Sequence, residues 1–147
     1  MGIQEKISAE LLESMKARDA VRTSTLRLLV SAFRNKEIER QKTLSDGELL
    51  EVIQSEAKRR QESIEQFRQA QRSDLASKEE AELKVLQAYL PQALSESELQ
   101  ALVAEAITSV QATSAKDMGK VMSALMPKIR GRADGKQAQQ LVQKSLS

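Results

Sequence analysis

A short basic segment near the end of the chain carries the clearest chemical signal. Residues 128–136 read KIRGRADGK, so four cations surround a turn that contains two glycines. A helix is expected to start directly after this turn, and the exposed amides of a helix N-terminus favour an anion. Arginine and lysine side chains are able to close around phosphate oxygens at such a place. The alternative is a solvated surface loop, because charge clusters usually contact only water.

The charges are sorted along the chain. The net charge of +2 combines −3 for residues 1–115 with +5 for residues 116–147. Residues 91–115 contain three glutamates and no lysine or arginine. A polyanion such as nucleic acid is therefore expected to approach the C-terminal third. Further basic residues at 27, 34 and 58–60 would extend this surface, although the glutamates between them favour a solvated face.

The composition limits how a nucleic acid would be recognised. The aromatic residues are Phe33, Phe67 and Tyr89, and all three are expected in the core. Bases that are splayed out of a strand need exposed rings to stack on. Recognition would therefore depend on phosphate contacts and on the shape of a folded RNA.

Most catalytic and metal sites are excluded by residue types. The chain has no Cys and no His, which removes thiolate ligands, the commonest metal ligand and the commonest general base. A Ser/Lys nucleophile remains open, but no GxSxG motif or P-loop accompanies one. We therefore assign no catalytic residue, metal site or cofactor. No apolar stretch approaches the roughly 20 residues that span a bilayer, and no signal peptide is evident, so we expect a cytoplasmic protein without membrane contact.

Hydrophobic periodicity predicts helices along the whole chain. Two prolines and five glycines are too few for a multi-stranded β fold. Capping boxes with hydrophobic staples at 44–49 (LSDGEL) and 94–99 (LSESEL) predict two helix starts. Asp134 with Gln137 is expected to cap the last helix. A first amphipathic helix is marked by apolar residues four positions apart: Ile3, Ile7, Leu11 and Met15.

One position of the third helix breaks its apolar pattern. Arg60 occupies a slot where a hydrophobic residue is expected. We expect its stem to pack and its guanidinium to reach solvent, with a buried ion pair as the alternative. The pattern lapses near residues 71–74, and Pro91 ends the following helix. The sequence thus predicts an all-α fold, with a four-helix N-terminal domain (1–90) followed by a small three-helix C-terminal domain (91–147).

Four segments resemble the GatB/YqeY family, and stand-alone YqeY-like proteins in particular. The most specific is DMGKVMSALMPKIRGRADGKQAQQLVQKSL at 117–146. Gln71 stands where many relatives have glycine, which leaves the helix break there open, and Gln139 replaces a frequent asparagine. The other similar segments are LRLLVSAFRNKEIE at 26–39, RRQESIEQFRQAQRSDLASKE at 59–79 and YLPQALSESEL at 89–99.

The resemblance implies a C-terminal domain like the tail of the B subunit of tRNA-dependent amidotransferases, which contacts tRNA. We therefore expect a non-catalytic accessory protein of translation that binds tRNA or structured RNA. The alternative is a protein-interaction module, or an auxiliary component of a glutamine-dependent amidotransferase (a carbon–nitrogen ligase), that contacts this enzyme or an aminoacyl-tRNA synthetase. The chain supplies no parts for ATP binding, glutamine hydrolysis or acyl transfer. The resemblance implies RNA-facing roles for five residues: Lys120, Lys128, Arg130, Arg132 and Lys136.

Overall fold

The computed structural model describes residues 2–147 and consists mostly of helices. Seven α-helices, one short 3-10 turn and no strand occur in that range, which confirms the predicted all-α class. The chain divides into two compact units, Met1–Pro91 (unit 1) and Gln92–Ser147 (unit 2). That each unit folds by itself as a domain stays a prediction.

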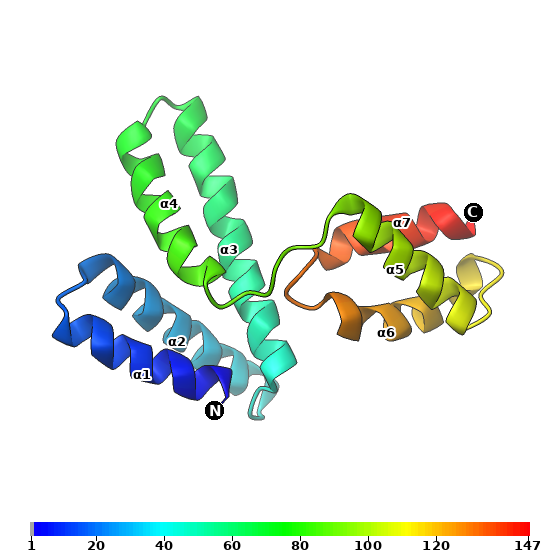
Figure 1. Cartoon of the computed structure of the whole chain (residues 1–147), viewed down its shortest axis with the longest axis horizontal. Coiled ribbons are helices and arrows are strands. Elements are labelled where there is room, and N and C mark those ends of the chain that lie inside the picture. The colour runs from blue at the N-terminus through cyan, green and yellow to red at the C-terminus, as the bar shows by residue number, and fades with distance from the viewer. Residues whose placement is uncertain (1) are drawn as a thin grey trace. The chain divides into compact units, whose positions relative to one another are not determined.

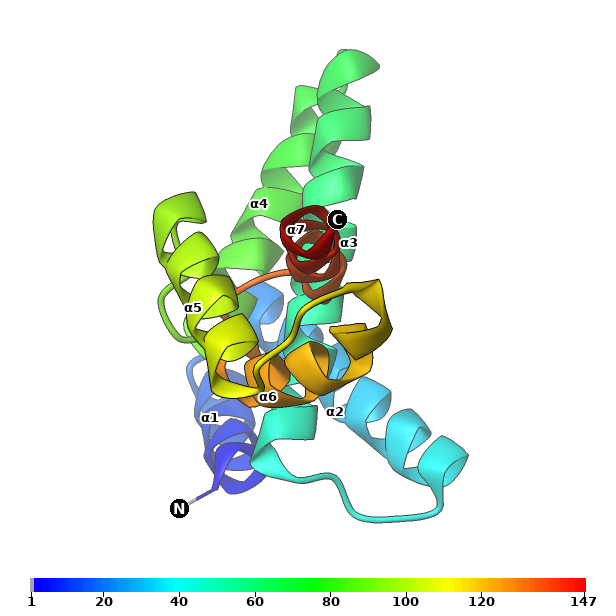
Figure 2. The same cartoon turned by 90° about the vertical axis from the view of Figure 1, so that its right-hand side faces the viewer.

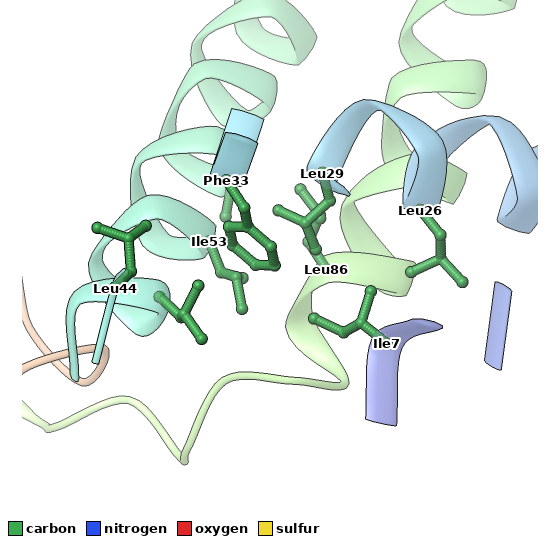
Figure 3. Packing of buried hydrophobic residues seen from close by; sticks show 9 residues of the cluster. Ile7, Leu26, Leu29, Phe33, Leu44, Ile53 and Leu86 are labelled. Atoms are coloured by element: carbon green, nitrogen blue, oxygen red, sulfur yellow. The ribbon is translucent and has the colours of Figure 1, made fainter. Parts of the chain in front are cut away.

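Unit 1 is built from two antiparallel helical hairpins. Helix α1 (Ile3–Lys16) lies beside α2 (Ala20–Arg40), and α3 (Asp46–Gln69) lies beside α4 (Ser73–Gln87), as Figure 1 shows. All four helices contribute side chains to one core, so the two hairpins form a single packed body. Buried residues that meet there include Ile7, Leu26, Leu29, Phe33, Leu44, Ile53 and Leu86 (Figure 3).

The predicted capping boxes are both present. The Ser45 hydroxyl accepts a hydrogen bond from the Glu48 amide (3.3 Å), and the Ser45 amide donates to the Glu48 carboxylate (3.2 Å). The same reciprocal pair joins Ser95 and Glu98 at 3.2 and 3.1 Å. Leu44, the staple residue before the first box, is buried in the core of unit 1. These local rules therefore place the starts of α3 and α5 where the sequence predicts them.

The helix break near Gln71, which the sequence did not decide, is present. Helix α3 ends at Gln69 and α4 begins at Ser73, and Gln71 itself adopts a left-handed conformation with a φ of 59°. Glycine is the residue that usually occupies this position after a helix, because a side chain disfavours positive φ. The glutamine accordingly makes the same turn at some conformational cost.

The prediction that the guanidinium of Arg60 reaches solvent is wrong. Its side chain is 10% exposed, and its guanidinium pairs with Glu82 of α4 (Nε to Oε2, 3.3 Å) and with Glu56 one turn earlier (Nη1 to Oε2, 3.3 Å). The stem does pack, but the neighbouring helix covers the head and supplies its counter-charge. Periodicity alone does not reveal which residue of a partner helix faces a given slot.

The expected apolar stripe of α1 also fails at its last member. Met15 is 45% exposed, whereas Ser14 is fully buried. Steps of four residues advance about 400° around a helix, so three such steps turn Met15 away from the face that Ile3 starts. The Ser14 hydroxyl is satisfied by the carbonyl of Leu11 (2.7 Å) and the hydroxyl of Thr23 (2.8 Å). A hydrogen-bonded serine thus takes the core position.

A polar cluster joins α1, α2 and the end of α4. Tyr89 donates a hydrogen bond from its hydroxyl to the carboxylate of Glu10, which also pairs with Arg22 at 3.3 Å. The Lys6 ammonium lies 5.8 Å from the centre of the Tyr89 ring. Burial, followed by the contact with Glu10, raises the pKa of Tyr89 to about 12. The last residues of unit 1 are therefore held against its first helix.

Unit 2 is a bundle of three helices. Helix α5 (Glu96–Ser109) is followed by a 3-10 turn (Ala115–Asp117), α6 (Met118–Ile129) and α7 (Gly135–Leu146). Figure 2 looks nearly along α7, with α5 and α6 beside it. The three methionines of α6 (Met118, Met122 and Met126) pack against the core of unit 2. The buried residues are Leu99, Val103, Ala106, Val121, Leu125, Ile129, Ala138 and Val142.

Residues 2–147 contain neither a helix that could cross a membrane nor a cluster of metal-ligating side chains. No helix there is long and apolar enough to cross a membrane. No group of three or more Asp or Glu side chains is placed to hold a metal ion within the same range.

Candidate nucleic-acid interface

The basic segment forms the connection between α6 and α7. Helix α6 continues through Pro127 to Ile129, and the amides of Arg132 and Ala133 then both bond to the Ile129 carbonyl (2.9 and 3.0 Å). Gly131 is buried and has a φ of 75°, a conformation that any other residue would adopt only with strain. The turn is therefore tightly folded, in contrast to a flexible loop.

Arg132 fastens this turn to the segment that enters unit 2. Its Nε donates to the carbonyl of Gln92 (3.0 Å), and its own carbonyl accepts from the amide of Leu94 (2.8 Å). The pKa of Glu98 lies below its usual value, mainly because the Ser95 amide bonds to the carboxylate, and Arg132 adds a smaller electrostatic contribution. Arg132 therefore has a structural role beside α5.

Lys128 and Arg130 are also engaged by the protein. The Lys128 ammonium pairs with Glu105 of α5 at 3.2 Å, with both side chains well exposed. Such a surface pair contributes roughly 0–1 kcal/mol, so a phosphate would compete with it easily. Arg130 is half-buried, and its Nε atom is completely covered. Of these two cations, Lys128 is the one that solvent reaches freely.

Lys120 and Lys136 lie at the starts of their helices. Lys120 is exposed in the first turn of α6, where it helps to lower the pKa of Asp117, whose carboxylate mainly accepts from the Thr113 amide (2.9 Å). Lys136 is exposed in the first turn of α7, and its side chain forms no ion pair with any residue from 2 to 147. A helix dipole disfavours a cation at this end by about 0.3–1 kcal/mol, so both lysines are placed against the local preference.

Asp134 changes the expected anion site at the start of α7. Its carboxylate accepts a hydrogen bond from the Lys136 amide at 3.1 Å, so it caps the helix as predicted. One of the amides that was expected to attract a phosphate is therefore already satisfied by the chain. The lysine side chains, more than the helix N-terminus, remain available for an anion.

The five predicted RNA-facing residues do not form one cluster of free cations. Lys128 and Arg132 point toward partners on or before α5, while Lys120 lies eight residues before Lys128, about 12 Å along α6. Arg130 is half-buried, and Lys136 stands on the exposed side of α7. Their contact with RNA stays a prediction. The structure shows in addition that Lys128 and Arg132 already pair with groups of the protein.

Sequence reasoning missed Lys144, a further exposed cation on α7. It lies eight residues after Lys136, a spacing that places both lysines on the same side of a helix. Neither helix α6 nor helix α7 contains an acidic residue, whereas α5 contains Glu96, Glu98 and Glu105 and no cation. The charges of unit 2 are thus sorted by helix. The net charges of the sequence segments only suggested this arrangement.

A protein-family model described as "Yqey-like protein" matches residues 4–146, nearly the whole chain. The chain belongs to the Yqey-like protein family. This confirms the resemblance carried by the four segments, and the match extends across both units of the structure.

Several fungal proteins are similar to this Yqey-like chain. "Altered inheritance of mitochondria protein 41, mitochondrial" of Pyrenophora tritici-repentis is 32% identical over 130 residues, which cover 87% of the chain and 71% of the relative. The protein of the same name from Lachancea thermotolerans is 35% identical over 108 residues, or 71% and 58% of the two chains. An uncharacterised protein of Schizosaccharomyces pombe is 37% identical over 90 residues, or 61% and 73%. Because two of these names are mitochondrial, the cytoplasmic location stays an expectation.

Proposed function

We propose that this Yqey-like protein binds tRNA or another structured RNA through the basic side of unit 2, without catalysing a reaction itself. The observation that carries the proposal is the sorting of charge by helix, since α6 and α7 hold lysines and no acid. A polyanion would be attracted to these helices and repelled by α5. The resemblance to the amidotransferase tail supports tRNA as the RNA.

The cations best placed to contact RNA are exposed lysines that form no ion pair within the described part of the protein. Lys120, Lys136 and Lys144 are exposed, and no residue in the described part of the chain forms an ion pair with them. Replacing them removes positive charge and leaves the hydrogen bonds of the α6–α7 turn intact. Replacing Arg130 or Arg132 would disturb that turn, so a loss of binding in such a variant would not report on RNA contacts.

The test is tRNA binding by fluorescence anisotropy across a salt series. Each phosphate contact contributes a slope of roughly −0.7 to −0.9 in log affinity against log salt, so losing three contacts flattens the slope by roughly 2–3. We expect this change in a Lys120→Ala/Lys136→Ala/Lys144→Ala variant whose helicity is unchanged by circular dichroism.

A matched variant of unit 1 controls for net charge. Lys16, Lys78 and Lys84 are exposed lysines of α1 and α4 with no ion pair to residues 2–147. Their replacement by alanine removes the same charge and is expected to leave most of the slope. Equal losses in both triple variants, or equal affinity of the wild type for tRNA and heparin, would overturn specific binding through unit 2.

A second candidate function is docking on a protein partner, such as an amidotransferase or an aminoacyl-tRNA synthetase. It is favoured by large apolar side chains that unit 1 leaves in water, since Leu28 is 58% and Ile38 69% exposed on α2. Exposed apolar side chains of this size often mark contact surfaces when they gather in a patch. Co-purification of a defined partner that survives nuclease and high salt, and that Leu28→Asp/Ile38→Asp abolishes, would support docking. Release of ammonia from glutamine by the purified chain would instead point to glutaminase activity, the amide-releasing half of an amidotransferase reaction.

A further inference from the structure

Helix α7 presents a polar strip of uniform chemistry to solvent. Lys136, Gln140, Gln143 and Lys144 follow the i, i+4, i+7, i+8 spacing that places residues on one side of a helix. The opposite side is buried through Ala138 and Val142. All four strip residues are exposed, and their side chains form no hydrogen bond or ion pair with any part of the chain that the structure describes.

The strip combines two kinds of recognition group. Lysine is a point charge suited to phosphate, whereas the glutamine amide both donates and accepts hydrogen bonds. The two lysines are separated by about 12 Å along the helix axis, and the amides lie between them. A ligand that matches this order has anionic groups at both ends and neutral groups that donate and accept in the middle.

A double-stranded RNA helix has this order across its minor groove. That groove is wide and shallow, and it displays 2′-hydroxyls, which both donate and accept, between two phosphate backbones. The two lysines are about 12 Å apart along α7, a spacing that suits a wide groove and exceeds the roughly 6 Å minor groove of DNA. The groove of an RNA duplex therefore suits the α7 strip better than the minor groove of DNA does.

Unit 2 is poorly suited to single-stranded RNA because it contains no aromatic residue. All three aromatic residues of the chain, at positions 33, 67 and 89, belong to unit 1. Unit 2 consequently has no ring on which a splayed base could stack, and such stacking contributes much of the affinity for single strands. Paired bases need no stacking partner from the protein.

We propose that the α7 strip lies across the minor groove of an RNA double helix, with Gln140 and Gln143 bonded to 2′-hydroxyls and Lys136 and Lys144 near the flanking phosphates. This inference rests on the proposed RNA-binding function and names the form of RNA that the site takes. It predicts that the protein distinguishes an RNA duplex from a DNA duplex of the same sequence, and that glutamines make the distinction.

The test compares three probes of one sequence, an RNA duplex, a DNA duplex and single-stranded RNA, by anisotropy with the full chain. Wild type is expected to bind the RNA duplex most tightly. Two hydrogen bonds of typical net strength correspond to about a thirtyfold loss, so Gln140→Ala/Gln143→Ala should bind the RNA duplex about thirtyfold more weakly. Its affinity for the DNA duplex should change less than about twofold.

A glutamine pair on α3 is the matched control. Gln61 and Gln66 are exposed on a helix and form no side-chain hydrogen bond with residues 2–147, so Gln61→Ala/Gln66→Ala should leave binding unchanged. If the strip variant loses RNA and DNA affinity equally, or neither, while the triple lysine variant still flattens the salt slope, the groove inference is wrong and the RNA-binding function stands. If wild type binds none of the probes and no tRNA, the proposed function fails and this inference with it.

Discussion

The buried guanidinium of Arg60 allows a quantitative test of how the two helices of the α3–α4 hairpin are joined. Replacing it with alanine removes two packed methylenes, which is worth about 1.5 kcal/mol at about 0.8 kcal/mol each. It also leaves Glu82 and Glu56 without their cation, and the Glu82 side chain is only 13% exposed. Leaving a fully buried charge unpaired costs about 3–5 kcal/mol.

The partial exposure of both carboxylates reduces that penalty. Glu56 is 21% exposed, and water reaching it offsets part of the lost pairing, so we take about 1.5–2 kcal/mol for the electrostatic part. Arg60→Ala is therefore expected to lower the free energy of unfolding by about 3 kcal/mol. Arg60→Met keeps the stem and is expected to lower it by about 2 kcal/mol.

Urea unfolding followed by circular dichroism measures these changes, and a double-mutant cycle isolates the ion pair. Combining Arg60→Met with Glu82→Gln leaves neither partner charged alone, so the pair should be coupled by about 1–2 kcal/mol. The neighbouring Arg59 is 74% exposed and pairs with Glu56 at 3.6 Å, and Arg59→Met should cost no more than about 0.5 kcal/mol. Effects of the Arg60 and Glu82 variants that add within about 0.3–0.5 kcal/mol would refute a buried pair.

Three further predictions concern a turn and two titrating groups. Gln71→Gly should raise the free energy of unfolding by about 1 kcal/mol by relieving the positive φ, whereas Gln66→Gly inside α3 should lower it by about 1 kcal/mol, both measured by urea unfolding. The pKa of Glu48 is lowered from 4.5 to about 2, first by the Ser45 amide, so its folded-state stabilisation is present above pH 4.5 and is lost as pH falls toward 2. The pH dependence of stability in that window should therefore weaken in Glu48→Gln, and unchanged profiles would contradict the assignment. Tyr89, the single tyrosine, should titrate near pH 12 by phenolate absorbance; its stabilisation is present below pH 10 and lost between 10 and 12, and a midpoint near 10 would show that burial and Glu10 do not act on it.

Local sequence rules placed most of the fold correctly. The boxes at Ser45 and Ser95 depend on atoms within four residues of each other, so the sequence contains all that determines them. Arg60 and Met15 failed for the opposite reason, because their environments depend on which neighbouring helix covers them. Residue spacing defines a face, and tertiary packing decides whether that face is buried.

The candidate site also combines features that follow from local sequence with features that depend on tertiary packing. Residue types alone located the basic turn, but they did not show that Arg132 holds the Gln92 carbonyl or that Lys128 already pairs with Glu105. Those partners lie 40 and 23 residues away in sequence, beyond any local pattern. The spacing of Lys136 and Lys144 is present in the sequence, but the density of charge along the chain does not show that they share one side of a helix.

The two ends of α7 offer a way to separate folding from binding. A helix dipole makes the N-terminal end positive and the C-terminal end negative. Lys136→Glu therefore places an anion where the dipole favours it and should raise the free energy of unfolding by about 0.3–1 kcal/mol, less any repulsion from Asp134. Lys144→Glu places one in the last turn and should lower it by a similar amount.

Binding responds differently from stability to these two changes. If both lysines contact phosphates, each reversal of charge should weaken tRNA binding and flatten the salt slope by at least roughly 0.7–0.9, whichever end of α7 is changed. Stability effects of opposite sign with binding effects of the same sign would show that α7 acts as a charged surface and that lost affinity is not a by-product of unfolding. Binding that follows stability, improving in Lys136→Glu and falling in Lys144→Glu, would instead mean that RNA contacts another part of unit 2.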